Sequence, residues 1–141
     1  MEQNNNTILF QEETTLPCAL ESMAIFSERL DEWFEQGNVP LETGMAIHIC
    51  IDEMMSNIVY YSEADDIRVK YMLSDKEIYL CLTDNGLPFD PLAKDTQIEK
   101  PEKGKRVKIG GLGIAMVRKM VKKILYQYEN GKNQLELFFS L

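Results

Sequence analysis

The sequence has few of the residues that build metal sites or disulfide frameworks. Its 141 residues include three cysteines, widely spaced and set among apolar neighbours, and one histidine, His48. A zinc site of the usual Cys/His kind lacks enough ligands at workable spacing, and an odd number of separated cysteines does not indicate a disulfide framework. We expect Cys18, Cys50 and Cys81 to pack as small apolar side chains and His48 to pack within a helix.

Long apolar runs and an excess of basic charge are also missing. No apolar run reaches the roughly 18 residues that a membrane span needs. The N-terminal MEQNNNTILF carries Glu2 and no basic residue before its first apolar stretch, unlike a secretory signal. The net charge of −8 argues against the basic surface of a nucleic-acid-binding protein. We therefore expect a cytoplasmic protein that binds neither membranes nor nucleic acid.

The pattern of apolar residues predicts one domain over residues 1–141 with helices gathered before and between strands. The chain is 45% hydrophobic, enough for one buried core. The predicted elements are a strand over 7–12, an amphipathic helix from Leu16 to Phe34 with an N-cap at Thr15 and an end at Gly37-Asn38, a helix over 42–61 buried on most sides, a hairpin of 67–73 and 77–84, a helix over 112–123, and a hairpin of 125–128 and 134–139. This order predicts an α+β sandwich with helices on one sheet face.

The helix over 42–61 carries a polar stripe. Glu53 and Asn57 are four residues apart, so their side chains share one face with Asp52 and Ser56 beside them. Burying an amide without partners costs roughly 2–7 kcal/mol, and a charge costs more. Asn57 offers an amide oxygen that suits Mg²⁺, and Glu53 is placed to orient or deprotonate a nucleophile. The alternative is a polar stripe solvated at a groove.

A second candidate segment follows the predicted strand over 77–84. The Asp84 carboxylate can accept a hydrogen bond from an exocyclic amine, and Gly86 would let a ring or ribose approach the backbone closely. Asp-Asn-Gly is also ordinary turn chemistry. The following Pro88-Phe89-Asp90-Pro91 does not continue as a clean second strand, which favours a site over a hairpin turn.

A third segment, Gly110-Gly111-Leu112-Gly113, opens a predicted helix. Glycines there expose backbone N–H groups at a helix N-terminus, a good anion site. A Walker lysine and a dinucleotide-binding glycine pattern are both absent, and a flexible loop is the alternative. Ahead of the glycines, residues 94–108 hold six basic and three acidic side chains, Lys105 and Arg106 among them. Such a loop is either simply solvated or able to close over a polyanion.

These segments, in this order, resemble the motifs of the GHKL ATP-binding superfamily, which histidine kinases, gyrase and certain chaperones share. Within it, the sequence looks most like the stand-alone anti-sigma-factor serine/threonine kinases of bacteria. Glu53-x-x-x-Asn57 resembles the N box of that family, and residues 84–91 and 110–114 resemble its two glycine boxes. The likeness covers about residues 7–141.

The resemblance implies a Bergerat fold, with helices layered on a mixed, mainly antiparallel sheet. Mg-ATP would lie between the sheet and the helix that carries Asn57, under a lid at about 92–109. Glu53 would be the general base, Asn57 the magnesium ligand, and Asp84 the residue that holds the adenine amine. The other residues expected to bind the nucleotide are Gly86, Phe89, Lys105, Arg106, Gly110, Gly111, Leu112 and Gly113.

The partner that the resemblance implies is a small anti-sigma-factor antagonist, phosphorylated on Ser or Thr. A sigma factor is the alternative partner, and a homodimer is one assembly of this family. The chain has Tyr61 where the family commonly has a histidine, and Ile109 where a basic residue commonly precedes the second glycine box. These differences bear on kinase activity and sigma binding more than on ATP binding. A non-catalytic ATP-binding module that binds a protein partner is therefore the alternative function, followed by an interaction domain with a degenerate site.

Overall fold

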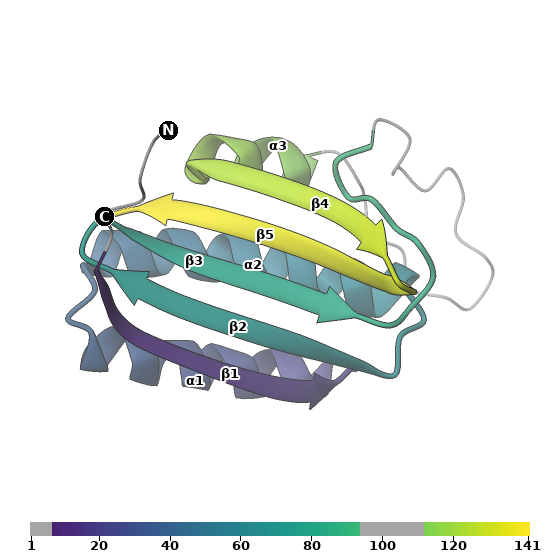
Figure 1. Cartoon of the computed structure of the whole chain (residues 1–141), viewed down its shortest axis with the longest axis horizontal. Helices are drawn as coiled ribbons and strands as arrows, with labels where there is room; N and C mark the ends of the chain where they lie inside the picture. Colours follow the sequence, from purple (N-terminus) through teal and green to yellow (C-terminus); the bar gives the residue numbers. More distant parts are fainter. Residues whose placement is uncertain (1–6, 94–111) are drawn as a thin grey trace.

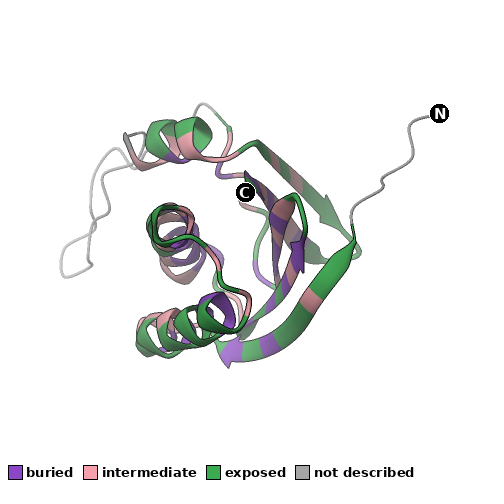
Figure 2. Ribbon diagram, turned by 90° about the vertical axis from the view of Figure 1, so that its left-hand side faces the viewer, coloured by how far each residue is buried: buried purple, intermediate pink, exposed green. Residues whose placement is uncertain are grey.

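The computed structural model describes residues 7–93 and 112–141, which form two layers (Figure 1). The elements of this part of the chain are β1 (Ile8–Pro17), α1 (Glu21–Gln36), α2 (Leu41–Tyr61), β2 (Asp66–Ser74), β3 (Glu77–Asp84), α3 (Leu112–Met120), β4 (Lys123–Glu129) and β5 (Lys132–Ser140). Figure 2 shows all three helices on the same side of the curved sheet. The predicted α+β two-layer fold is confirmed.

The sheet has the strand order β1-β2-β3-β5-β4. All four pairings within the described chain are antiparallel, so the mixed part of the expected sheet is not seen there. The strand at each end is an edge strand, β1 on one side and β4 on the other. The two predicted hairpins are present, and Asn130 (φ 55°) and Gly131 (φ 74°) form the left-handed turn that Asn-Gly favours.

The core lies between the helices and the sheet. Its largest fully buried side chains come from both layers, and they include Phe26, Leu30, Ile47, Met54, Met55, Ile67, Tyr71, Leu80, Leu82 and Leu137. The rings of Trp33 and Tyr71 join the layers with centroids 5.0 Å apart. Cys50 and Cys81 are buried, Cys18 is half-buried, and all three are free thiols, as the sequence predicts.

His48 packs between α1 and α2. Its Nε2 atom lies 2.7 Å from Oδ1 of Asp31, and its ring meets the edge of the Phe34 ring at 5.4 Å between centroids. The residue therefore joins two helices, which agrees with the packing role expected of it.

The predicted start of the first helix is wrong. β1 continues through Pro17, and α1 begins only at Glu21. Thr15 is paired with Arg68 in the sheet rather than capping a helix. Proline is accepted at the end of an edge strand because no neighbour there needs its missing N–H. The backbone carbonyl of Pro17 instead accepts the Ser22 hydroxyl at 2.6 Å.

The helix over 42–61 is buried or half-buried on most sides, as predicted, and one face is open. Leu41, Met45 and Ile49 are 80%, 57% and 38% exposed. The sheet, α1 and α3 cover the other side of α2 and leave this face open. Among the described residues, no helix is long and apolar enough to cross a membrane.

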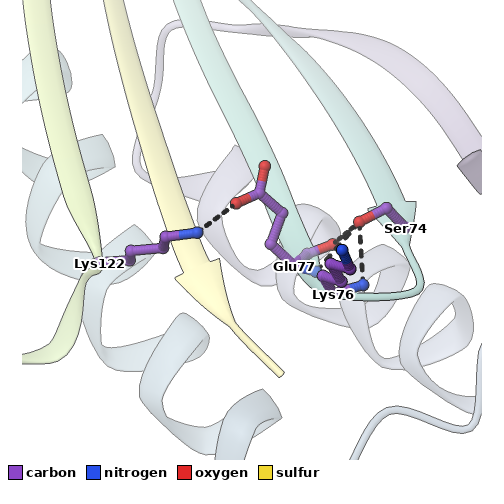
Figure 3. Close-up of polar contacts among 4 residues, drawn as sticks. All are labelled: Ser74, Lys76, Glu77 and Lys122. Atoms are coloured by element: carbon purple, nitrogen blue, oxygen red, sulfur yellow. Dashed lines mark hydrogen bonds and ion pairs between the residues drawn. The ribbon is translucent and has the colours of Figure 1, made fainter. Parts of the chain in front are cut away.

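The β2–β3 turn is fixed by one serine (Figure 3). The Ser74 hydroxyl accepts the backbone N–H groups of Lys76 at 3.2 Å and Glu77 at 3.0 Å, and donates to the carbonyl of Glu77 at 3.1 Å. The Lys122 ammonium donates to the Glu77 carboxylate at 3.1 Å. That ion pair ties the start of β4 to β3 across β5.

Candidate functional site

The candidate site is built around Asp84, the last residue of β3, which lies directly opposite Asn133 of β5. Asp84 is 3% exposed. Its Oδ1 atom accepts the backbone N–H of Gly86 and the Asn133 amide, both at 2.9 Å. Burial raises the pKa of the Asp84 carboxyl, and these two hydrogen bonds partly offset that rise. Oδ1 accepts both hydrogen bonds from the described chain. Oδ2 can therefore still accept a hydrogen bond from a donor such as an exocyclic amine.

Asn133 holds the loop after β3 in place. Its Nδ2 also donates to the carbonyl of Leu87 at 2.8 Å, and its Oδ1 accepts the Phe89 N–H at 3.0 Å and the Tyr126 hydroxyl. Both amide protons and both acceptor positions are thus used, which fixes the side-chain orientation. Sequence reasoning missed Asn133 as a site residue. The available signal was an asparagine at the start of a strand, where this residue type is depleted.

Asn57 reaches the same place from the helical layer. It is 6% exposed and lines a cavity together with Asp84 and Asn133. Its side chain makes no hydrogen bond to the described chain, but its polar atoms keep some access to solvent, since the one fully buried side-chain polar atom without a partner among the described residues is the Tyr71 hydroxyl. A buried amide that lacks a protein partner is costly unless water or a ligand satisfies it. Asn57 therefore fits an oxygen ligand for a hard cation. The described residues hold no group of three or more His, Cys, Asp or Glu that could bind a metal.

The cavity between α2 and the sheet is nearly closed in this structure. Its lining residues are Met54, Asn57, Ile58, Ser62, Leu82, Asp84, Phe89, Pro91, Tyr126, Asn133 and Leu135. Its volume is about 10 Å³, room for one water molecule. Phe89 lines one side of the cavity. The centroid of its ring lies 5.1 Å from that of the Tyr61 ring, at an interplanar angle of 34°. Tyr61 thus packs against the loop that carries Phe89.

Gly86 makes a close contact with the end of α2. A Cβ atom at this position would overlap the carbonyl group of Ser62, and the neighbouring Leu87 N–H donates to that carbonyl at 2.6 Å. The glycine was expected to let a ring or ribose approach. The contact that the structure places there is instead with backbone, and it joins the loop after β3 to the helix that carries Asn57.

Glu53 lies one turn before Asn57 and faces α3. It is half-buried, and a Cβ atom at Gly113 would overlap its carboxyl group. The first turn of a helix favours negative charge, since unpaired N–H groups and the helix dipole are there. Glu53 and Gly113 therefore adjoin each other where α2 meets the start of α3, one turn from Asn57, whereas Asp52 of the same predicted stripe is exposed.

The rest of the predicted site lies outside the described residues. This applies to Lys105, Arg106, Gly110 and Gly111, to nearly all of the expected lid at about 92–109, and to the side chain of Leu112. Among the predicted residues that are described, the structure brings Asn57, Asp84 and Phe89 to one cavity. It places Gly86 behind that cavity, and Glu53 and Gly113 beside it.

A family model for the histidine kinase-like ATPase domain matches residues 16–139. The match covers most of the chain, which therefore belongs to this family, and it confirms the superfamily expected from the three motifs. Nucleotide binding is the property that this family of ATPase and kinase domains shares, so the cavity at Asp84 is the candidate place for it. No curated protein matches the sequence significantly.

A solved structure supports the fold. The chain is similar to part of the structure of the RsbU and RsbW domains of Rv1364c from Mycobacterium tuberculosis, with a TM-score of 0.67 and 18% sequence identity. The similarity covers 94% of this chain and 33% of that one. At this identity the likeness concerns the arrangement of helices and strands, and the chain corresponds to about a third of the larger protein.

Proposed function

We propose that this domain, over residues 1–141, binds Mg-ATP and phosphorylates a small anti-sigma-factor antagonist on serine or threonine. The observation that supports this most is the Asn57 amide, which is 6% exposed and lacks a hydrogen-bond partner within the described chain. It faces the cavity of Asp84 from the opposite layer. Two polar groups with spare capacity thus meet in one enclosed place, in a chain of the histidine kinase-like ATPase family.

Asp84 is proposed to recognise the base. Its Oδ2 atom would accept the exocyclic amine of adenine, while Asn133 and the Gly86 N–H hold Oδ1. The present cavity of about 10 Å³ is far below the roughly 300 Å³ or more of a typical ligand site. The loop with Phe89 and Pro91 would therefore have to move away from Tyr61 for adenine to enter.

Asn57 and Glu53 are proposed to act at the phosphates. When bound, Mg-ATP supplies the phosphoryl group and a metal ion that offsets its charge. The Asn57 amide oxygen would coordinate that ion together with water. Glu53, one turn earlier, would accept the proton of the incoming serine or threonine hydroxyl. Because charged phosphates need donors and positive charge, we assign this role to Lys105, Arg106, Gly110, Gly111, Leu112 and Gly113.

The partner is proposed from the likeness of motifs and fold. A structure that includes an RsbW domain shares this fold, and the three motifs resemble those of anti-sigma-factor kinases. The proposed partners are an antagonist protein as substrate and a sigma factor as the alternative. Because the proposed reaction uses ATP and a regulator of transcription, the proposed location is the cytoplasm.

The alternative function is a non-catalytic module that binds ATP and a protein partner. Tyr61 favours it, because this tyrosine stands in the place of a histidine common in the kinases and packs on Phe89. The variant Glu53→Gln separates the two functions. The assay mixes the purified protein with Mg-[γ-³²P]ATP and with antagonist-type proteins whose genes lie near its own. It measures the radioactive label transferred to the antagonist. The affinity for ATP is measured separately.

A kinase loses phosphate transfer in Glu53→Gln and keeps ATP affinity, whereas a binding module regulates its partner equally well with either residue. Asp52→Asn is the matched control, since it removes a carboxylate from the exposed side of the same turn. Label transfer that is equal in wild type and Glu53→Gln would contradict the role of Glu53. No label on any candidate antagonist would contradict the kinase function.

A further inference from the structure

The helical layer carries an apolar stripe on its outer side. α1 and α2 lie side by side on one face of the sheet, and their sides turned away from the sheet are exposed (Figure 2). On α2 the exposed apolar residues are Leu41, Met45 and Ile49. They are spaced by four residues, so they follow one side of the helix. Adjoining apolar side chains that are left exposed mark an interaction surface more often than scattered ones do.

A groove adjoins this stripe where α1 ends and α2 begins. Its apolar lining comes from Phe34 of α1, from Val39 and Pro40 of the connection, and from Leu41 and Met45 of α2. Its volume is about 380 Å³, within the range of roughly 300–1,000 Å³ that is typical of binding clefts. We call it the α1–α2 groove. It has room for apolar side chains that another molecule inserts.

Acidic side chains border the α1–α2 groove. Asp31 and Glu35 of α1 line it, and Glu42 lies three residues before Met45 on α2. Among the described residues, Glu35 and Glu42 have no ion-pair partner, and Asp31 contacts His48.

The two helices offer almost no positive charge to offset these acids. Residues 21–61 carry eight acidic side chains and one basic one, Arg29, and Arg29 donates to the Thr14 hydroxyl of β1. Glu35 lies in the last turn of α1, which has no basic residue. Negative charge is unfavourable at that end of a helix, because the unpaired carbonyl groups and the helix dipole are there. A cation brought by a partner would offset this cost.

The charge of the groove limits the class of partner. Nucleic acids and anionic lipid surfaces are negatively charged, so the acids repel them. A second copy of the chain that presented the same face would place acids against acids. A basic protein segment with one apolar side instead matches both the stripe and the acids around it. A helix suits this surface because the stripe repeats at helical spacing and the groove lies between two helices.

We propose that the α1–α2 groove and the stripe beside it bind a basic amphipathic helix of a partner protein. The apolar side chains of that helix enter the groove, and its lysine or arginine residues meet Asp31, Glu35 and Glu42. The surface lies away from the candidate nucleotide cavity, because α2 lines that cavity with Asn57 and neighbours on its opposite face. The inference therefore does not depend on the proposed kinase activity.

A synthetic peptide tests the surface. It is made of leucine and lysine, is about 18 residues long, or roughly 27 Å as a helix, and has its leucines at helical spacing on one side. Fluorescence anisotropy of the labelled peptide is measured against the full chain. Circular dichroism of the mixture reports whether the peptide becomes helical on binding. A peptide of the same composition with shuffled order and a leucine–glutamate peptide are the controls for amphipathicity and charge.

Two variants of the chain separate the apolar and the charged contributions. Met45→Gln is expected to raise the dissociation constant about tenfold, because it removes apolar area that the peptide buries. Glu35→Gln is expected to raise it about threefold at low salt and less at high salt. The matched controls are Ile25→Gln, at an exposed apolar residue elsewhere on α1, and Glu129→Gln, at an exposed acid on β4. Both are expected to bind like wild type.

The proposal is overturned if the amphipathic peptide does not bind, or if the shuffled or the acidic peptide binds as tightly. It is also overturned if Met45→Gln and Glu35→Gln weaken binding no more than their controls do, since the attraction would then be general to an acidic protein. Sedimentation velocity of the chain alone completes the test. A dimer that Met45→Gln dissociates would assign the surface to a second copy instead.

Discussion

Asn133 at the start of β5 donates a hydrogen bond to Asp84 at the end of β3, with 2.9 Å between Nδ2 and Oδ1. The two residues are direct neighbours in the sheet register. This bond orients the carboxylate so that its second oxygen is left for a ligand. It also connects the loop after β3 to the last strand, because the same asparagine binds Leu87 and Phe89.

Replacing Asn133 with Ala is expected to lower the free energy of unfolding and to weaken nucleotide binding together. The change removes a partner from the buried Asp84 carboxylate and from two partly buried backbone groups of the loop, at up to roughly 1–3 kcal/mol for each group. Urea denaturation followed by circular dichroism measures the loss. Gln134→Ala is the control: among the described residues the Gln134 side chain hydrogen-bonds only Gln127, at the surface, so the loss is expected to be small. Equal effects of the two substitutions would contradict the role of Asn133.

Asp84→Asn is expected to stabilise the fold at neutral pH while reducing ATP affinity. Burial raises the pKa of the folded carboxyl above its ordinary value of 3.8. Such a group stabilises the folded state below the unfolded pKa, and this contribution is lost as the pH rises through the folded pKa. The variant has no such titration, so its stability relative to wild type is expected to increase as the pH rises above about 4, the unfolded pKa of an aspartate.

Denaturation of both proteins across this pH range measures the difference in the free energy of unfolding. Affinity for ATP is expected to fall roughly tenfold or more, because an amide replaces a charged acceptor. A stability difference that does not change with pH, or one that decreases, would contradict the buried carboxylate. Unchanged ATP affinity would contradict its proposed contact with the base.

Gly113→Ala is expected to separate stability from catalysis. The new methyl group overlaps the Glu53 carboxyl, which can turn away because it is the end of a flexible side chain. Alanine is the better helix former, so the free energy of unfolding is expected to stay the same or to rise by about 0.5–1 kcal/mol. Phosphate transfer is expected to fall as in Glu53→Gln. Full transfer in this variant would show that the proximity of Gly113 and Glu53 has no part in the reaction.

Gly86→Ala is expected to destabilise the fold by about 1–3 kcal/mol, the usual cost of overpacking. Its Cβ meets the backbone carbonyl of Ser62, which has little freedom to move. Gly131→Ala is the comparison: nothing lies within 4 Å of its Cβ, and only the positive φ of 74° disfavours alanine. If Gly86→Ala costs no more than Gly131→Ala, the contact with the end of α2 is not required for the fold.

Local sequence patterns predicted most of the fold. The spacing of apolar residues located α2, and the Asn130-Gly131 pair located the last turn, because each depends on neighbours in the sequence. The start of α1 was placed too early because Thr15 and Pro17 suit a helix N-terminus as well as the end of an edge strand. Pairing with Arg68 and Asp66 of β2, which lies far away in sequence, decided between the two.

The candidate site could be predicted in part. Asn57, Asp84 and Phe89 were found because each lies in a short motif, and the cavity brings them together. Asn133 was missed because its role depends on the register between β3 and β5, which no local pattern reveals. The contact of Gly86 with Ser62 was missed for a similar reason, since it depends on where α2 ends in space.

The most direct test of a nucleotide site between α2 and the sheet is calorimetric titration of ATP and ADP into the folded protein with magnesium, in wild type and Asn57→Ala. The buried Asn57 amide predicts binding that depends on magnesium and is lost in the variant. Binding to neither protein, with both shown to be folded, would contradict the site and leave an interaction domain. Equal binding by both proteins would contradict the place of Asn57 in it.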